Sequence, residues 1–145
     1  MSLKDRIREE LNAARRERDK QRTLLLTTTI SEIRNKEIEL QHDLSDGEVV
    51  DVIQKAIKRR KEAAEQMRAG ARPELAEKEE HEAQQLSAYL PPQISEADVR
   101  AMVREAIAGG AGTMGAVMGR IAPRIKGVFD GREANRIVKE ELGTT

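Results

Sequence analysis

Apolar residues recur at three- and four-residue steps through the first ninety residues, which is the period of helices that bury one face. Four helices are expected there, over about 3–19, 23–41, 46–70 and 73–90. The residues expected to face the core from the second and fourth helices are Leu26, Ile30, Ile33, Ile38, Leu75, Ala83, Leu86 and Tyr89 or Leu90. We interpret the run from Leu24 to Leu26 as core, since it is far shorter than the ~20 apolar residues of a membrane span.

The diproline Pro91-Pro92 divides the chain. Neither proline can donate a helical hydrogen bond, and each disfavours helical geometry in the residue before it. A new helix start follows, with Ser95 and Asp98 spaced as a capping box. The sequence therefore predicts an N-terminal helical domain of about four helices over residues 1–90, a linker over 91–94 and a small C-terminal three-helix domain over 95–145.

The last two helices of the C-terminal domain are bounded by local signals. The first of this pair has Thr113 as its cap and Pro123 just beyond its end. The second follows Asp130, whose carboxylate is placed to cap the first turn. Gly127 and Gly131 give backbone freedom to the loop between the two helices.

The composition agrees with an all-α fold and excludes several kinds of functional site. Charged residues make up 36% of the chain and aromatic residues 1%, as expected for long amphipathic helices and not for sheets. The chain has no cysteine, which excludes disulfides, thiolate metal sites and a cysteine nucleophile. Lysine plus arginine and aspartate plus glutamate both total 26, so any contact with nucleic acid must be local. No targeting or membrane-spanning segment is recognised, and a cytoplasmic protein is expected.

Two patterns match the residue spacing of known functional motifs, but the segments around them rule out those functions. Residues 110–115 match the dinucleotide fingerprint G-x-G-x-x-G, but a helix precedes them where that motif needs a strand. Glu39 and His42 have the spacing of half a di-iron site, but the sequence has no second Glu-x-x-His helix. We therefore expect no cofactor, no metal site and no catalysis by this chain alone.

Three stretches are rich in cations. The stretch around residues 15–22 is interpreted as charges at a helix end, with a contact site as the alternative. The stretch around 55–61 is interpreted as a helix face whose charges pair four residues apart. Between Thr113 and Lys139, six cations stand against two carboxylates, an excess of four positive charges. A patch of this kind, with the free amides of a helix start beside it, suits phosphate groups. An ordinary solvated surface is the alternative.

The same region resembles a known family. The matching residues are Met114-Gly115, Val117-Met118, Pro123, Lys126-Gly127, Asp130-Gly131, Asn135 and Val138, with Tyr89 to Ser95 upstream. Together they resemble the YqeY family over essentially the whole chain, and the last third is similar to the tail domain of GatB, a subunit of the Glu-tRNA(Gln)/Asp-tRNA(Asn) amidotransferase. That resemblance implies a helical domain that contacts tRNA. Val128 and Phe129 stand where relatives commonly carry a basic or small residue, so the loop carries less charge here.

We therefore interpret the chain as a non-catalytic, tRNA-associated accessory protein of translation. Its C-terminal domain is expected to bind tRNA or a protein such as an amidotransferase or an aminoacyl-tRNA synthetase, with no DNA or membrane partner. The predicted tRNA-binding residues are Arg120, Arg124, Lys126, Gly127, Arg132, Asn135, Arg136 and Lys139. The alternative is a helical adaptor that binds a protein through an apolar groove lined by Met102, Met114 and Met118. An enzyme whose site assembles only with a partner is the third possibility.

Overall fold

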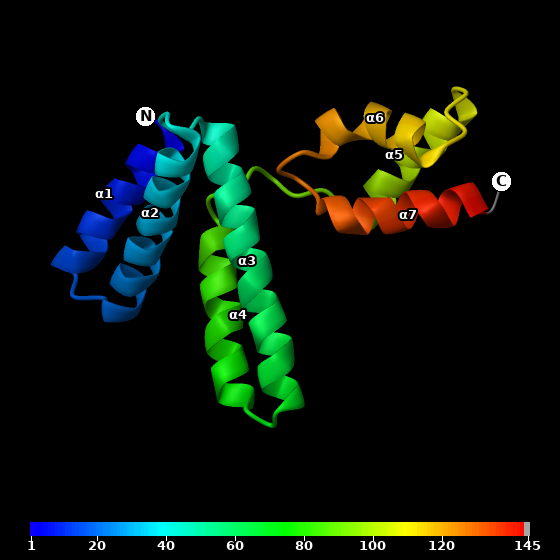
Figure 1. Cartoon of the computed structure of the whole chain (residues 1–145). Helices are drawn as coiled ribbons and strands as arrows, with labels where there is room; N and C mark the ends of the chain where they lie inside the picture. Colours follow the sequence, from blue (N-terminus) through cyan, green and yellow to red (C-terminus); the bar gives the residue numbers. More distant parts are fainter. Residues whose placement is uncertain (144–145) are drawn as a thin grey trace. The chain divides into compact units, whose positions relative to one another are not determined.

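The protein folds into helices. The structure is a computed structural model, and it describes residues 1–143. This range contains seven α-helices and no strand (Figure 1). In chain order they are α1 (Leu3–Arg16), α2 (Lys20–Leu40), α3 (Asp46–Ala69), α4 (Pro73–Ser87), α5 (Glu96–Ala108), α6 (Met114–Ile125) and α7 (Gly131–Gly143). The all-α class predicted from the sequence is confirmed.

The chain divides into two compact units, Met1–Leu90 with α1 to α4 and Pro91–Thr145 with α5 to α7. Each unit has its own group of buried apolar residues. The fully buried side chains include Ile7, Leu26, Ile33, Ile53 and Leu86 in the N-terminal unit, and Val99, Val103, Val117, Ile121, Ile137 and Val138 in the C-terminal unit. Each unit is therefore held together by a separate core.

Two helical hairpins form the N-terminal unit. The longer one pairs α3 with α4, and the shorter one, α1 with α2, packs beside the first part of α3 (Figure 1). The capping box at the start of α3 forms as its spacing predicts, because the Ser45 hydroxyl accepts the Glu48 N–H at 3.3 Å and Glu48 accepts the Ser45 N–H at 3.0 Å. The Leu3 N–H donates to Asp46 at 2.9 Å, which ties the start of α1 to the start of α3.

Three apolar residues that the sequence pattern assigns to the core are exposed. Leu24, Ile38 and Leu75 expose 65%, 70% and 38% of their surfaces. Ile38 lies five residues after the buried Ile33, which places it about 140° further around α2. In α4 the buried position falls one residue later, on Ala76. These three predictions are wrong because they assign large apolar side chains to the core without regard to the helical period.

A glutamate takes the position on α2 that the sequence pattern assigns to Ile38. Glu37 Oε2 accepts hydrogen bonds from Lys4 Nζ at 2.7 Å and from the Leu44 N–H at 3.0 Å. These two donors, Lys4 first, hold the pKa of Glu37 below its ordinary value. The contacts join the start of α1 to the end of α2 and to the loop that follows it.

α6 continues through Pro123, which the sequence pattern places beyond the helix. The Lys126 N–H still bonds to the Ala122 carbonyl at 3.1 Å. A proline lacks the N–H that would bond to the carbonyl four residues earlier, here that of Gly119. Gly119 is exposed, so water can satisfy this carbonyl. The helix therefore accommodates the proline in its last turn.

Tyr89, just beyond the end of α4, connects α4 to the first two helices. Its side chain is buried, and its hydroxyl accepts a hydrogen bond from Arg22 Nη2 at 3.1 Å. The Arg6 guanidinium lies 5.0 Å from the centre of the ring. Glu10 lies 3.5 Å from Arg6 and 3.6 Å from Arg22. Burial, and then the hydrogen bond with Glu10, raises the pKa of Tyr89 to about 12.

The buried position of Tyr89 can be tested by absorbance, because it is the only tyrosine in the chain. In the folded protein, phenolate is expected to form only near pH 12, whereas in denaturant it is expected near pH 10, its ordinary value. Since the folded pKa is the higher one, the tyrosine's contribution to stability is complete below about pH 10 and is lost as the pH rises toward about 12. A native titration centred at pH 10 would contradict this burial.

Candidate nucleic-acid interface

The three helices of the C-terminal unit alternate in direction, so that α5 and α7 are parallel and α6 runs against both (Figure 1). Glu96 at the start of α5 contacts Arg136 of α7 at 3.3 Å, and Arg104, further along α5, contacts Glu141 at 3.0 Å. These two contacts show that α5 and α7 run in the same direction. As a result, the end of α6 and the starts of α5 and α7 lie at the same end of the unit.

The loop between α6 and α7 is fixed to the segment before α5. The Ile94 N–H donates to the Val128 carbonyl at 3.1 Å, and Gln93 Nε2 donates to the Gly127 carbonyl at 3.0 Å. Gly127 is buried and has a φ of 80°, a left-handed conformation that favours glycine. Within the predicted linker over 91–94, the last two residues thus bond to the C-terminal unit.

Three of the predicted tRNA-binding residues share the outer face of α7. Arg132, Asn135 and Lys139 are exposed and lie three and four residues apart, on the side away from the buried Ile137. We call these three residues the α7 stripe. Among residues 1–143, no carboxylate pairs with Arg132 or Lys139. Lys126, at the end of α6, is also exposed and forms no ion pair within the same range.

Arg136, predicted as part of the same patch, is surrounded by carboxylates. Its guanidinium contacts Glu140 at 2.6 Å, Glu133 at 2.9 Å and Glu96 at 3.3 Å. Hydrogen bonds to Glu133 and then Glu140 raise the pKa of Arg136 above its ordinary value. The charge of Arg136 is therefore balanced inside the unit, and a phosphate would have to displace these carboxylates to reach it.

Arg120 and Arg124 lie on the flank of α6 that faces α5. Arg120 Nη1 donates to the Ala106 carbonyl, in the last turn of α5, at 3.2 Å. Arg124 contacts Glu105 at 3.7 Å, and both of these side chains are more than half exposed. Such an exposed pair holds its members weakly. The predicted residues therefore fall on two helix faces and on the loop between them.

An ion-pair network that the sequence analysis does not predict joins α5 to α7. Glu141 is buried and accepts hydrogen bonds from Arg104 Nε and Arg100 Nη1, both at 3.0 Å. These arginines, Arg104 first, hold the pKa of Glu141 below its ordinary value. Arg100 also contacts Glu140 at 2.6 Å and Glu96 at 2.7 Å. The four-residue spacings of Glu96 with Arg100 and of Arg136 with Glu140 are the local signals that the sequence offers for the network.

Acid is expected to weaken the C-terminal unit through this network. The pKa values of Glu96, Glu140 and Glu141 lie below the ordinary 4.5 because arginines bond to the charged carboxylates. Since the folded pKa is the lower one, the contribution to stability is complete above about pH 4.5 and is lost as the pH falls further. Melting temperatures measured from about pH 7 to 3 should fall at the acid end, and Arg100→Met should flatten this fall. An identical acid dependence in the variant would contradict the network's role.

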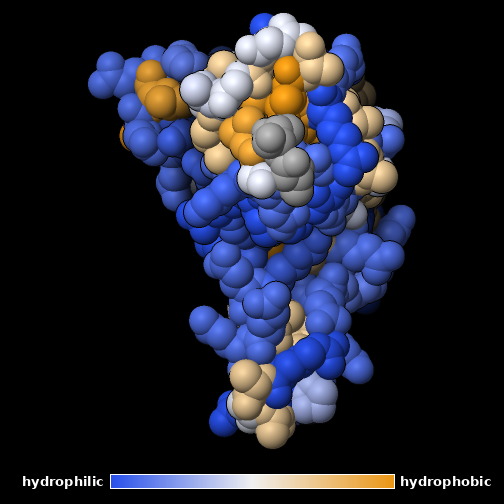
Figure 2. All heavy atoms as spheres, turned by 90° about the vertical axis from the view of Figure 1, so that its right-hand side faces the viewer, coloured by the Kyte–Doolittle hydropathy of each residue, from blue (hydrophilic) through white to orange (hydrophobic). Residues whose placement is uncertain are grey.

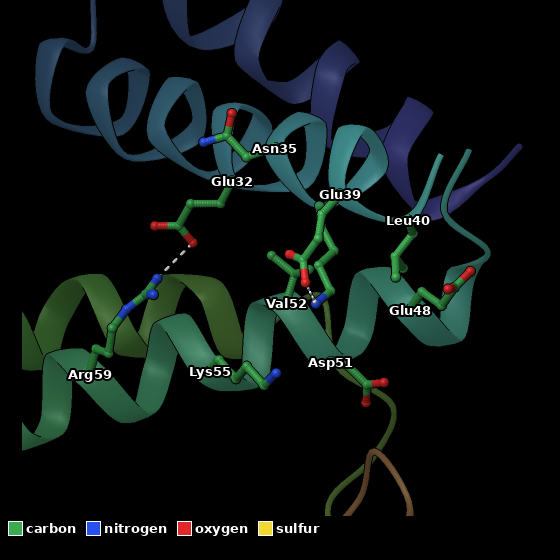
Figure 3. A pocket seen from close by; sticks show the side chains of 10 residues that line it. Glu32, Asn35, Glu39, Leu40, Glu48, Asp51, Val52, Lys55 and Arg59 are labelled. Carbon is green, nitrogen blue, oxygen red and sulfur yellow. Dashed lines mark hydrogen bonds and ion pairs between the residues drawn. The ribbon is translucent and has the colours of Figure 1, made fainter. Parts of the chain in front are cut away.

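A cleft of about 530 Å³ lies between α2 and α3 in the N-terminal unit (Figure 3). Its charged lining residues are Glu32, Glu39, Glu48 and Asp51 against Lys36, Lys55 and Arg59. Several of these charges are already paired, with Arg59 2.8 Å from Glu32 and Lys36 3.2 Å from Glu39. No cluster of metal-binding side chains occurs in residues 1–143. We therefore place the candidate site on the C-terminal unit and not in this cleft.

The fold and the site define a small all-helical protein in which a four-helix unit is followed by a three-helix unit with an exposed basic stripe. None of the helices described is long and apolar enough to cross a membrane. The sequence pattern of the Yqey-like protein family matches residues 4–142, and the chain belongs to this family. The resemblance to the YqeY family over essentially the whole chain is thereby confirmed.

Two relatives show how far the similarity extends. The chain is 37% identical over 89 residues to "Uncharacterized protein C22F3.15" of Schizosaccharomyces pombe, which covers 61% of this chain and 72% of that protein. It is 28% identical over 144 residues to "Altered inheritance of mitochondria protein 41, mitochondrial" of Pyrenophora tritici-repentis, which covers 95% of this chain and 80% of that protein. The second similarity includes residues of both units.

Proposed function

We propose that this chain is a non-catalytic accessory protein that binds tRNA through the outer face of α7. The observation that carries the proposal is the contrast between two sets of cations. Lys126 and the cations of the α7 stripe are exposed and form no ion pair among residues 1–143, whereas Arg100 and Arg136 are surrounded by carboxylates. An exposed, unpaired cation can contact a phosphate and release its counterions without breaking an internal pair.

The arrangement of the α7 stripe also suits a nucleic acid. The Asn135 amide, between two cations, offers both donors and an acceptor to a ribose or phosphate. The start of α7 is fixed, because Asp130 Oδ1 accepts the Arg132 N–H at 2.7 Å. The stripe therefore presents its side chains from a helix whose first turn is capped.

The resemblance of residues 112–142 to the tail domain of GatB supports tRNA as the partner, since that tail is a helical domain that contacts tRNA. An amidotransferase or an aminoacyl-tRNA synthetase is the protein partner that this proposal implies. We also propose a cytoplasmic location. The proposal assigns binding, and no chemistry, to the C-terminal unit.

The adaptor alternative rests on the methionines of the C-terminal unit. Met102, Met114 and Met118 are half-buried against its core. Figure 2 shows a small apolar group on a face that is otherwise mostly hydrophilic. Flexible methionine side chains can adapt to an apolar partner. A protein partner that is lost on Met118→Gln, together with absent tRNA binding, would favour the adaptor.

An isosteric charge change tests the tRNA proposal. Asn135→Asp places a carboxylate between Arg132 and Lys139, where it should repel phosphate and pair with the neighbouring cations. We expect tRNA affinity, measured by fluorescence anisotropy of labelled tRNA at about 50 mM salt, to fall about three- to tenfold. Asn35→Asp, at an exposed asparagine of the N-terminal unit, is the matched control and should bind as wild type. Equal affinities for the two variants would count against the α7 stripe.

A further inference from the structure

The turn between α1 and α2 carries a second group of exposed cations. Arg15, Arg16, Arg18 and Lys20, which we call the turn cluster, are all exposed. Among residues 1–143 none of the four pairs with a carboxylate. Residues 15–20 contain these four cations and two carboxylates, so the turn has a net charge of +2.

Arg22, close to the turn cluster in sequence, shows what a structural arginine does in this unit. Its guanidinium turns inward, 3.1 Å from the Tyr89 hydroxyl and 3.6 Å from Glu10. Among residues 1–143, the only side-chain hydrogen bond of the turn cluster is a long one, from Arg15 Nη1 to Asn12 Oδ1 at 3.5 Å. The cluster therefore differs from Arg22 in having its charges directed to solvent.

Backbone N–H groups already bond to three of the last carbonyls of α1, so the side chains of the turn cluster are not needed to cap these carbonyls by hydrogen bonds. The Glu17 N–H donates to the Ala13 carbonyl at 2.9 Å, and the Asp19 N–H donates to the Ala14 carbonyl at 3.0 Å. The Arg18 N–H donates to the Arg15 carbonyl at 3.2 Å. This is the backbone pattern that closes many helices without side chains.

Arg18 itself has an unfavourable backbone conformation. Its φ is 57°, in the left-handed region where glycine or asparagine is preferred at a helix end. A glycine would make the same turn with less strain. The arginine side chain makes no ion pair in residues 1–143 that compensates for this strain. Gln41 and Ala71 share this left-handed conformation, so the strain alone does not mark a site, but the Arg18 charge remains available to a partner outside the chain.

We infer that the turn cluster is a second RNA-binding surface, which contacts phosphate groups from the N-terminal unit. Guanidinium groups bind phosphates through paired hydrogen bonds, and three of the four cations are arginines. A membrane surface fits less well, because residues 15–22 include no large apolar side chain to enter it. The inference rests on the proposed function, because the partner is again tRNA, but it places a second contact on the N-terminal unit.

The first test removes charge from the turn cluster in the full-length chain. Arg15, Arg16 and Lys20 are changed together to glutamine, and binding to labelled tRNA and to poly(U) RNA is measured from about 50 to 200 mM salt. We expect about tenfold weaker binding at the lowest salt and a log–log salt slope about two units closer to zero. A control for net charge changes Lys55, Lys58 and Lys61 to glutamine on α3 of the same unit. Equal effects of the two triple variants would overturn the inference.

Arg18→Gly provides a second test, which distinguishes a contact with RNA from a purely structural role of Arg18. Relief of the left-handed strain should raise the melting temperature by about 2–4 °C. If Arg18 contacts RNA, the same variant should bind tRNA about two- to fivefold more weakly despite its greater stability. Unchanged RNA binding in this variant would overturn a contact by Arg18.

A comparison of RNA binding by these variants separates the inference from the proposed function. If the turn cluster variant weakens RNA binding and Asn135→Asp does not, the proposed function fails while the inference stands. If only Asn135→Asp weakens binding, the inference fails. If neither does and the turn cluster instead governs binding to phosphatidylserine vesicles, the surface recognises lipid and the inference is overturned.

Discussion

Replacing Ile137 with alanine is expected to destabilise the C-terminal unit strongly and to leave the stability of the N-terminal unit unchanged. Ile137 is fully buried in the core that α5, α6 and α7 share. Removing such a side chain costs about 2–5 kcal/mol, from lost contacts and the cavity left behind. A unit of this size is stabilised by only about 3–8 kcal/mol. Hydrogen exchange followed by mass spectrometry should therefore show lost protection in α5 to α7 alone.

Ile53→Ala is the matched change in the N-terminal unit, because Ile53 is also fully buried. It should reduce protection in α1 to α4 and spare α5 to α7. The two variants together test whether the division at Pro91 separates two independently stabilised cores. Loss of protection in all of these helices at once, in either variant, would instead indicate one cooperative core.

Changing Lys126, Arg132 and Lys139 together to glutamine is expected to weaken tRNA binding at least tenfold at about 50 mM salt. Each of these cations is exposed and unpaired among residues 1–143, so each is available to a phosphate. Loss of three such contacts removes the counterion release that drives binding. Glutamine retains polarity but not charge, and no ion pair within the described residues 1–143 is broken. The melting temperature should therefore stay close to that of the wild type.

The Lys55/Lys58/Lys61→Gln triple variant is the control for this change too. It removes the same number of charges from α3, so a general effect of net charge would weaken its tRNA binding equally. A specific role for the α7 stripe predicts full affinity in this control. If both triple variants lose affinity to the same degree, binding reflects overall charge and not the stripe.

Helix starts are the features of this fold that follow most directly from the sequence, because they depend on neighbouring residues. Ser45 with Glu48 and Ser95 with Asp98 form the capping boxes that their spacing predicts. The buried faces are less predictable. Glu37 occupies the core side of α2 because of Lys4, which lies 33 residues away. A partner so distant leaves no trace in local periodicity.

The candidate site shows the same division between local and distant signals. The cations themselves can be located in the sequence, but their availability depends on tertiary contacts. Arg136 has Glu133 and Glu140 at helical spacing, yet its third carboxylate, Glu96, lies 40 residues away. Arg120 bonds to a backbone carbonyl, which has no sequence signature at all. The structure is therefore needed to separate the occupied arginines from the α7 stripe.

The salt dependence of tRNA binding is the most direct test of a tRNA-binding role for Lys126 and the α7 stripe. Counterion release makes the slope of log affinity against log salt report the number of phosphate contacts. Between about 50 and 200 mM salt, the full-length Lys126/Arg132/Lys139→Gln variant should have a slope about two units closer to zero than the wild type. Parallel slopes for the two proteins, or no binding by the wild type at low salt, would contradict that role.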